Sequence, residues 1–251
     1  MIIIKSKRCD IHNLRRQYPD AIIHDVTSHA TDEFVKFSPF YPHGGIPVPF
    51  TPNVTAMSVE SIWQGLKDYV NSGIDTSVFR NSTMKDIKRT KRKYGEMRGH
   101  KKGVFGTEHL GYLEVRYEIY APTYLWMLEH KVSNLVRKLK EESENNVVIL
   151  LDYNTNEDLS DRNSPLSHAG LIKAFIEGRY PVSTNETVDP TPAGTPEEFE
   201  FKPGDKVRHQ KFGKGVVKEL QEKEGRVVVD FVEDGIKTLA IRLARLEKID
   251  E

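Results

Sequence analysis

Three polar residues with helical spacing, Glu60, Gln64 and Lys67, are the first in the chain that could share a chemical task. They lie at i, i+4 and i+7 in MSVESIWQGLKDY (residues 57–69), where Ser58 is a candidate N-cap. The apolar residues of the same stretch predict a second side that faces a core: Val59, Ile62, Trp63, Leu66 and Val70. A carboxylate can stabilise developing positive charge or activate water, and an amide or ammonium group can assist a departing group. These three residues could equally form a solvent-exposed surface, where the helix dipole favours Glu60 in the first turn.

A basic run at residues 85–102, KDIKRTKRKYGEMRGHKK, carries nine Lys and Arg against Asp86 and Glu96. The formal net charge of the whole chain is +0, so this positive charge is local. Its density suits the phosphates of a nucleotide or a nucleic acid, although such runs also form solvated faces. The phosphate-binding candidates are Lys88, Arg92, Lys101 and Lys102.

An aromatic segment at residues 34–53, FVKFSPFYPHGGIPVPFTPN, is predicted to be a long loop because Pro and Gly interrupt every periodic pattern. Loops of this length without regular structure are commonly functional or disordered, and its aromatic content argues against disorder. Aromatic rings can stack on a flat base. The stacking candidates are Phe37, Phe40 and Tyr41, together with Tyr112 further along the chain.

The remaining elements of the first 180 residues predict mixed helix and strand. Strands are expected over 2–5, 21–26 and 147–152, and helices over 10–18, 83–94, 112–130 with a break near Pro122, 132–142 and 164–178. The apolar strand 147–152 ends on Asp152, which is either an active-site carboxylate or the cap of a turn or helix. Trp63 and Trp126 are expected in the core.

Composition changes after this region. Residues 182–200 are rich in Pro, Thr and Glu, which is typical of a linker, and residues 201–251 contain short alternating stretches separated by Gly. This pattern predicts a small five-stranded barrel. We therefore expect domains at 1–181 and 201–251, joined by a flexible linker at 182–200.

Several function classes are disfavoured by composition. The 251 residues contain no apolar run long enough to span a bilayer, and the opening MIIIK is too short for a secretory signal, so a cytoplasmic protein without a membrane partner is expected. The single cysteine, Cys9, excludes an internal disulfide, and an inert thiol is a simpler interpretation than a nucleophile. The histidines lack metal-ligand spacing such as HExxH, so neither a metal site nor a cofactor is expected.

The tail, PGDKVRHQKFGKGVVKEL followed by GRVVVDFVEDGIKTLAIRLARLEKI, resembles the Tudor-like module at the C-terminus of UvrD/PcrA-type DNA helicases. The resemblance implies an SH3-like barrel that docks onto RNA polymerase or lies near DNA. A barrel that only stabilises the chain is the alternative.

The first domain more distantly resembles the NADAR family, which includes riboflavin-pathway N-glycosidases and enzymes that remove ADP-ribose from guanine in DNA. The similar segments are FSPFYP (37–42), SVESIWQGLK (58–67), YLEVRYEIY (112–120), LLDYNTNEDLSD (150–161) and LSHAGLIKAFIEG (166–178). The resemblance implies an α+β, mainly helical domain with a small sheet. It implies catalytic roles for Glu60 and Lys67, and contacts to substrate from Gln64 and Arg116. The family's Trp-Gly after its acidic residue is missing here, so Asp152, Asp158 and Asp161 all remain candidates for a second carboxylate.

The combined interpretation is an N-glycosidase that acts on a modified or ADP-ribosylated base, with DNA as its partner and a tail that tethers it to DNA or RNA polymerase. A modified base of foreign DNA is one such substrate. Two alternatives remain: a non-enzymatic protein that binds ADP-ribose or nucleic acid, and a hydrolase of a small ADP-ribose or riboflavin-type metabolite.

Overall fold

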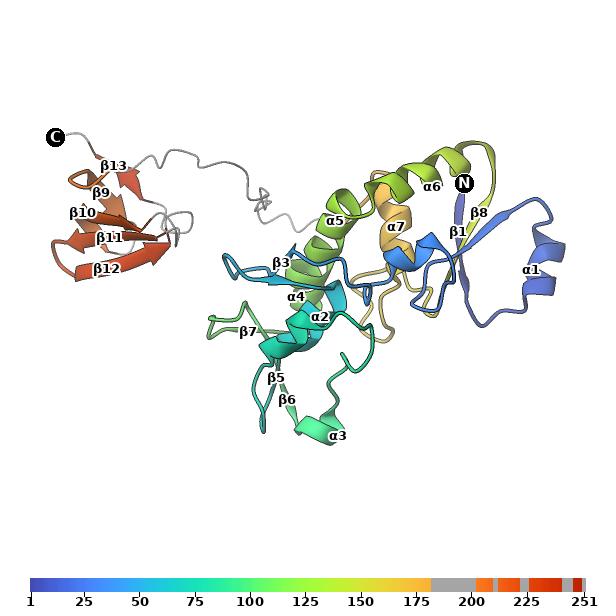
Figure 1. The fold of residues 1–251 in the computed structure, drawn as a ribbon, viewed down its shortest axis with the longest axis horizontal. Coiled ribbons are helices and arrows are strands. Elements are labelled where there is room, and N and C mark those ends of the chain that lie inside the picture. Colours follow the sequence, from blue (N-terminus) through green and yellow to red (C-terminus); the bar gives the residue numbers. More distant parts are fainter. Residues whose placement is uncertain (182–201, 210–211, 222–225, 241–245, 250–251) are drawn as a thin grey trace. The chain divides into compact units, whose positions relative to one another are not determined.

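The computed structural model describes residues 1–181, 202–209, 212–221, 226–240 and 246–249 (Figure 1). The chain divides into two compact units, Met1–Asp189 and Pro190–Glu251, which are treated separately below. The linker predicted at 182–200 lies outside the described residues. No helix in the described ranges is long and apolar enough to cross a membrane.

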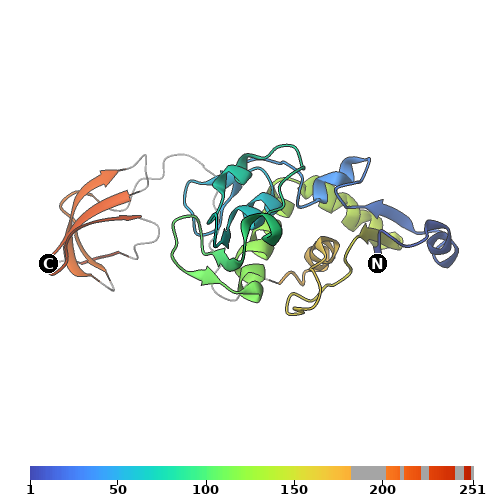
Figure 2. The ribbon, with the colours of Figure 1, turned by 90° about the horizontal axis from the view of Figure 1, so that it is seen from below.

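A three-stranded parallel sheet organises the first unit, with the order β1 (Ile2–Ser6), β8 (Val148–Asp152), β2 (Ile22–Asp25) (Figure 2). All five residues of the central strand β8 are buried, as its continuous apolar sequence predicts for a parallel strand. The helix α1 (Ile11–Gln17) connects β1 to β2, and the Asp10 carboxylate caps it by accepting a hydrogen bond from the backbone N–H of His12. These predicted elements are confirmed.

One long helical segment crosses the first unit. It consists of α4 (Tyr112–Val115), a π-helical turn η3 (Arg116–Tyr120) and α5 (Ala121–His130), and α6 (Ser133–Asn145) and α7 (His168–Ile176) pack nearby. The boundary predicted near Pro122 coincides with the change from the π-helical turn to α5, and Pro122 lies in the first turn of α5, where a missing N–H is tolerated. The π-helical turn directly precedes it, and such turns frequently occur at functional sites.

The helix that carries Glu60 is shorter than predicted. Ser58 caps α2 (Val59–Gly65) as expected, but the chain then enters a strand, β5 (Lys67–Tyr69). A Cβ atom at Gly65 would lie 2.3 Å from the ring of Phe79, so this glycine permits the close packing of the helix end. The prediction that Lys67 lies on the same helix as Glu60 is therefore wrong, and Val70 is 50% exposed instead of apolar core.

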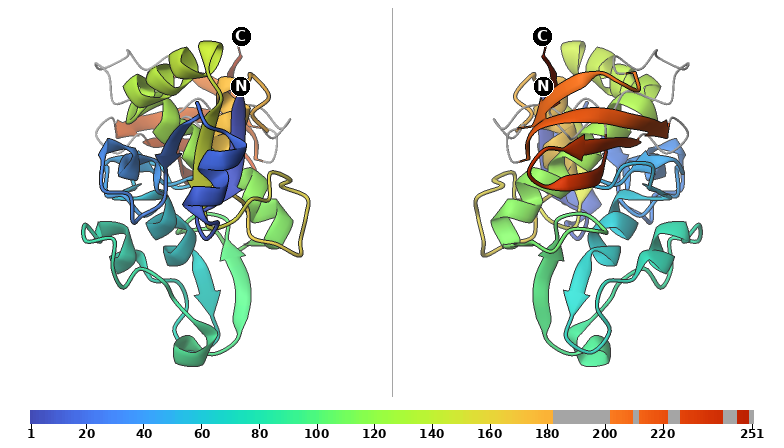
Figure 3. Two further views of the ribbon diagram at one scale, coloured as in Figure 1. Left: turned by 90° about the vertical axis from the view of Figure 1, so that its right-hand side faces the viewer. Right: turned by 90° about the vertical axis from the view of Figure 1, so that its left-hand side faces the viewer.

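The basic run forms strand and irregular structure where a helix over 83–94 was predicted. Only α3 (Lys91–Tyr94) is helical, because Met84 and Asp86 have φ angles of 59° and 56°, which interrupt a right-handed helix. The strand β6 (Met97–Lys101) pairs with β5 on one side and with β7 (His109–Leu110) on the other in an antiparallel sheet, and β5 and β6 lie side by side in Figure 3. Sequence periodicity did not predict this sheet.

The predicted aromatic loop is irregular for most of its length. It begins with the 3₁₀ turn η1 (Glu33–Phe37) and contains the two-residue strand β3 (Ile46–Pro47), which pairs with β4 (Thr55–Ala56). A second 3₁₀ turn, η2 (Thr76–Arg80), packs against α2. Within the aromatic segment, the carbonyl of Pro39 accepts a hydrogen bond from the backbone N–H of Glu60, which ties this segment to α2.

The second unit is an antiparallel sheet built from β9 (Lys206–His209), β10 (Gly213–Gln221), β11 (Arg226–Phe231) and β12 (Gly235–Ala240), and the two-residue β13 (Glu247–Lys248) pairs with β9. Its buried core consists of Val207, Val217, Val227, Val229 and Phe231. This arrangement is compatible with a Tudor-like barrel. Together the two units give the mixed helix and strand content that the sequence predicts.

Candidate functional site

Glu60 is held at the start of α2 by the chain around it. The hydroxyls of Ser58 and Ser61 bond reciprocally to each other's backbone N–H groups at 3.1 Å and fix the helix start. The backbone N–H of Glu60 donates to the carbonyl of Pro39 at 2.8 Å, which ties the aromatic segment to this helix. The side chain of Glu60 is buried, although charged side chains are rarely buried unless they are paired.

A chain of hydrogen bonds runs from the Glu60 carboxylate through Gln64 to Arg89. The Gln64 Nε2 group donates to Glu60 Oε1 at 2.7 Å, and the backbone N–H of Arg89 donates to Gln64 Oε1 at 2.9 Å. The amide orientation of Gln64 is therefore fixed from both ends. In the described part of the chain, Glu60 Oε2 has no hydrogen-bond partner.

Arg89 belongs to this site, although the sequence interpretation passed over it within the basic run. Its guanidinium is buried and donates to the carbonyls of Lys67 at 2.6 Å and Gly73 at 2.7 Å. Its carbon Cζ lies 4.9 Å and 4.8 Å from the ring centroids of Tyr69 and Tyr94. Arg89 therefore fixes the turn after α2, and no local pattern distinguishes it from its exposed basic neighbours.

Burial and nearby charges perturb the groups around Glu60. Burial raises the pKa of the Glu60 carboxyl, while the bond from Gln64 and the charges of nearby lysines oppose the shift. Burial lowers the pKa of Lys67, which Glu60 partly offsets. The structure thus brings Glu60, Gln64 and Lys67 together across the end of a helix and a strand. Clusters of perturbed groups are candidates for functional sites.

An aromatic wall adjoins α2. The ring of Trp63 lies 4.4 Å from His100, 5.5 Å from Tyr120 and 6.4 Å from Tyr112 between ring centroids. Trp63 is half-buried at the margin of the core, not fully inside it as predicted. Burial, with the charge of Lys67, lowers the pKa of His100 to about 3, so its imidazole is neutral. Within the described ranges, His100 Nε2 is buried without a hydrogen-bond partner.

The predicted stacking residues occupy different environments. Phe40 is half-buried, and the ammonium of Lys88 lies 5.4 Å from its ring centroid, while Tyr41 packs against His43. Phe37 is completely buried in the core beside Phe34, so its ring has no surface on which a base could stack. The prediction for Phe37 is therefore corrected, whereas Phe40 keeps an accessible ring.

The predicted phosphate-binding residues also lie in different environments. Lys88 is exposed and its charge acts on Glu60, which brings it to the site. Lys102 pairs with Glu118 at 3.1 Å and Glu108 at 3.6 Å, so its charge is already compensated. Arg92 is exposed on α3, and Lys101 is half-buried on β6. Among the described residues, no contact connects these last two side chains to Glu60.

Arg116 is structural in this arrangement. Its guanidinium is 2% exposed and donates to the hydroxyl of Tyr112 at 2.6 Å. It also donates to the carbonyls of Asp161 and Ser164, each at 2.6 Å. Arg116 thus orients Tyr112, which is 43% exposed, and anchors the loop after β8, while its contact with a substrate stays a prediction that its burial does not support.

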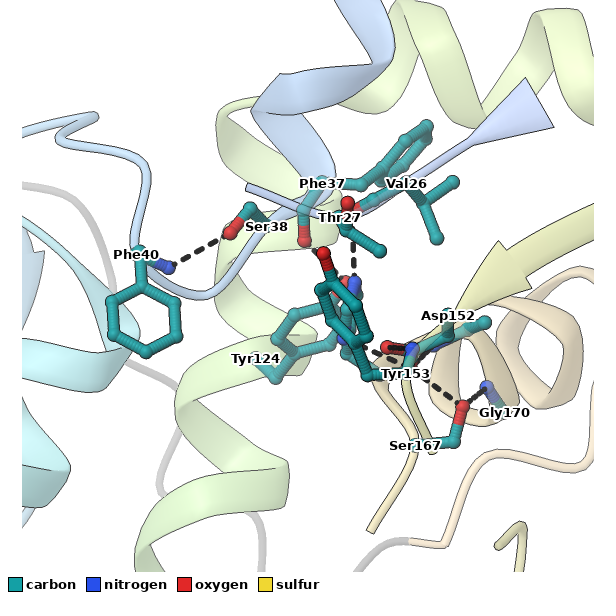
Figure 4. A network of polar contacts seen from close by, with 12 residues as sticks. Val26, Thr27, Phe37, Ser38, Phe40, Tyr124, Asp152, Tyr153, Ser167 and Gly170 are labelled. Carbon is teal, nitrogen blue, oxygen red and sulfur yellow. Dashed lines mark hydrogen bonds and ion pairs between the residues drawn. The ribbon is translucent and has the colours of Figure 1, made fainter. Parts of the chain in front are cut away.

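Asp152 has a structural environment as well, shown in Figure 4. Its Oδ2 atom lies 2.8 Å from the donating hydroxyl of Ser167 and 3.0 Å from Nδ1 of His168, and Oδ1 accepts from the N–H of Tyr153. Nε2 of His168 donates in turn to the carbonyl of Val26 at 2.8 Å. Both carboxylate oxygens are occupied at the start of α7, so Asp152 is a cap and an ion-pair partner, and its catalytic role stays a prediction that these contacts do not support.

The charges of this pair stabilise each other. Burial alone would raise the pKa of Asp152, but the charge and hydrogen bonds of His168 and Ser167 lower it. Burial would likewise lower the pKa of His168, but Asp152 raises it. With an acceptor at each ring nitrogen, the imidazolium is the form that satisfies both.

The other two acidic candidates lie in the loop after β8. Asp158 accepts from the hydroxyl and N–H of Ser160, and Asp161 accepts from Ser164 and from the N–H of Asn163. Both carboxylates thus stabilise turns. Among the described residues no group of His, Cys, Asp and Glu side chains could hold a metal ion.

The fold and the site describe a two-part protein, with an α+β unit that carries a buried carboxylate and a small antiparallel β unit. Residues 6–172 match a protein family of unknown function, DUF6939, and the chain belongs to that family. Residues 204–248 match the PcrA/UvrD tudor domain, which confirms the Tudor-like prediction for the tail. A search of curated proteins gives no significant match. Neither family match names a NADAR enzyme.

Proposed function

We propose that the first unit is an N-glycosidase that hydrolyses the bond between a sugar and a modified or ADP-ribosylated base, with Glu60 as its catalytic carboxylate. The observation that carries the proposal is the state of Glu60. One carboxylate oxygen is held by a fixed amide and, within the described ranges, the other has no hydrogen-bond partner. The resemblance of SVESIWQGLK and FSPFYP to NADAR segments supports the same assignment.

The proposed reaction uses groups that are already close to one another. As the bond from C1′ to the base nitrogen breaks, the electron pair leaves with the base and positive charge develops on the sugar. The Glu60 carboxylate stabilises this charge and accepts a proton from the water that adds to C1′. The ammonium of Lys67 donates a proton to the departing base and is reprotonated from Glu60, so water is the only reactant consumed.

The surroundings of Glu60 support a base and a phosphate as parts of the substrate. Phe40, Tyr112 and Trp63 offer accessible or half-buried rings for stacking, and Lys88 places a cation above the Phe40 ring. In a duplex the target nucleotide would have to leave the base stack before it reached such a site.

The Tudor-like unit is proposed to tether the enzyme to DNA or to RNA polymerase. A hydrolase of free nucleotides has little need of such a module, so the pairing favours DNA as the substrate. Deleting residues 200–251 should then reduce activity on DNA and leave activity on a small substrate unchanged. Equal activity on DNA without the tail would instead favour a metabolite hydrolase.

The decisive experiment incubates the purified chain with DNAs that carry different modified or ADP-ribosylated bases and identifies released bases by mass spectrometry. Base release with formation of an abasic site is expected for the wild type and not for the Glu60→Gln variant. If the variant releases base as fast as the wild type, the catalytic proposal fails. Binding of modified DNA without base release would favour the non-enzymatic alternative.

A further inference from the structure

A second polar surface lies where the strands of the parallel sheet end. The backbone N–H of Lys7, after β1, donates to the carbonyl of Asp152 at 2.7 Å, and that of Val26, after β2, donates to Leu151 at 3.3 Å. The carboxyl ends of all three strands therefore meet at one edge. In open sheets with parallel strands, ligands commonly bind outside this edge.

Tyr153 is an exposed aromatic residue at this edge. It directly follows β8, the residue is 38% exposed, and its backbone N–H donates a hydrogen bond to the Asp152 carboxylate. The guanidinium carbon of Arg8 lies 5.6 Å from the ring centroid, and the ring of His29 approaches it edge-on at 6.1 Å. In the part of the chain that the structure describes, Arg8 has no acidic partner, whereas its neighbour Lys7 pairs with Asp25 at 2.7 Å.

An open groove of about 410 Å³ begins at Tyr153 and continues over Asn154 and Asn156 to Ser164 and Pro165. Its far wall is rigid because Arg116 donates to the carbonyls of Asp161 and Ser164, and Nδ2 of Asn156 donates to the carbonyl of Ser164 at 3.3 Å. The side-chain amide of Asn154 makes no hydrogen bond within the described ranges, and it is half-buried at the groove. It can therefore donate and accept toward a ligand.

We propose that this groove binds one nucleotide unit, with the base stacked on Tyr153, the phosphate on Arg8 and His29, and the base edge on the amide of Asn154. An amide can pair with the donor and acceptor edge of a base. Asp161 is the acidic residue of the groove lining, whereas Arg8 contacts Tyr153, so the phosphate is assigned to Arg8. A free nucleotide and a nucleotide within single-stranded DNA share this chemistry. The site uses none of the groups assigned to glycosidic cleavage, so it stands whether or not Glu60 is catalytic.

The test measures binding of a fluorescein-labelled single-stranded hexanucleotide to the full chain by anisotropy, and binding of AMP by calorimetry. Tyr153→Ala loses base stacking, so its dissociation constant should be at least about fivefold higher than that of the wild type. Tyr153→Phe keeps the ring and should bind like the wild type. Arg8→Ala should weaken binding more than Arg137→Ala, which removes the same charge from the exposed face of α6.

The two ligands identify the source of the nucleotide. If AMP binds as tightly as the hexanucleotide, the ligand of the groove is a free nucleotide. If AMP binds much more weakly, the ligand is a nucleotide within single-stranded DNA. The proposal is overturned if neither ligand binds at millimolar concentration, or if Tyr153→Ala binds like the wild type. It is also overturned if Arg137→Ala weakens binding as much as Arg8→Ala, because the attraction would then be nonspecific.

Discussion

Glu60, in the first turn of a short helix, and Asp152, at the end of a central strand, are both nearly inaccessible, but they have opposite partners. Asp152 receives hydrogen bonds at both oxygens and lies against an imidazolium, and its pKa is lowered. Glu60 receives one hydrogen bond from a neutral amide, and burial raises its pKa. The comparison teaches that burial alone does not assign a role to a carboxylate. The groups that compensate its charge distinguish a stabilising residue from a reactive one.

The same contrast separates Arg89 from Arg116. Both guanidinium groups are buried and donate mainly to backbone carbonyls, and each fixes a segment beside one of the two carboxylates. Arg89 also orients Gln64 through its backbone, so it acts on the Glu60 site directly. Arg116 acts on the loop after β8 and on Tyr112. Each region thus has its own buried cation, and the two can be perturbed separately.

The largest difference between the two regions should appear in catalysis. Replacing Glu60 with Gln keeps the size of the side chain and removes the charge that the proposed reaction needs, so the rate of base release should fall about 10²–10⁴-fold. The rate is measured by mass spectrometry of the released base under single-turnover conditions. The charge-matched variant Glu129→Gln, on the exposed end of α5, should retain the wild-type rate. If Glu60→Gln and Glu129→Gln released base at the same rate, Glu60 would not be the catalytic carboxylate.

Asp152→Asn should instead act on stability. Removing one partner of a buried ion pair leaves the other without compensation, so the free energy of unfolding should fall by about 3–5 kcal/mol. Urea denaturation measures this change, and Asp20→Asn at an exposed position serves as the control. A loss below about 1 kcal/mol would show that the ion pair with His168 contributes little to the free energy of unfolding. Asp152 would then not be explained by a structural role.

A substitution at Gln64 should destabilise the hydrogen bonds around Glu60 without removing a charged side chain. The Gln64→Leu variant removes the donor to Glu60 and leaves the buried N–H of Arg89 without its acceptor, which should cost about 1–3 kcal/mol. The pKa of Glu60 should rise further, because the lost hydrogen bond lowers it in the wild type. Urea denaturation and carboxyl NMR titration measure the two effects. Gln17→Leu, at the exposed end of α1, should change neither.

The sequence predicted the parts of the fold that depend on local pattern. The buried strand that ends on Asp152 and the caps of Asp10 and Ser58 follow from apolar runs and from side chains that satisfy helix N–H groups. The tail was recognised from alternating stretches separated by glycine, and a family match confirms its Tudor-like character. These signals are local, so they can be read without tertiary contacts.

The missed parts depend on tertiary contacts. The pairing of β5 with β6 joins segments about thirty residues apart, and the basic run hides a strand because most of its side chains are exposed. The positive φ angles of Met84 and Asp86, and the burial of Arg89, have no counterpart in residue spacing. The strip of Glu60, Gln64 and Lys67 was expected on one helix, and the structure instead assembles it across a helix end and a strand.

The smallest expected effect, a change with pH, distinguishes the two carboxylates by its sign. The folded state raises the pKa of Glu60 above its ordinary 4.5, so ionisation of Glu60 costs stability at neutral pH, and this cost disappears as the pH falls below 4.5. Glu60→Gln should therefore be more stable than the wild type at pH 7 and equal to it near pH 4. In the folded state the pKa of Asp152 is lowered and that of His168 is raised. The stability that this pair confers is therefore fully present only between about pH 3.8 and pH 6.5. This stability is lost as the pH falls through the folded pKa of Asp152 or rises through that of His168. Urea midpoints of Glu60→Gln and Asp152→Asn from pH 2 to 8 measure the two profiles. A Glu60→Gln variant less stable than the wild type at pH 7 would show that Glu60, like Asp152, stabilises the fold.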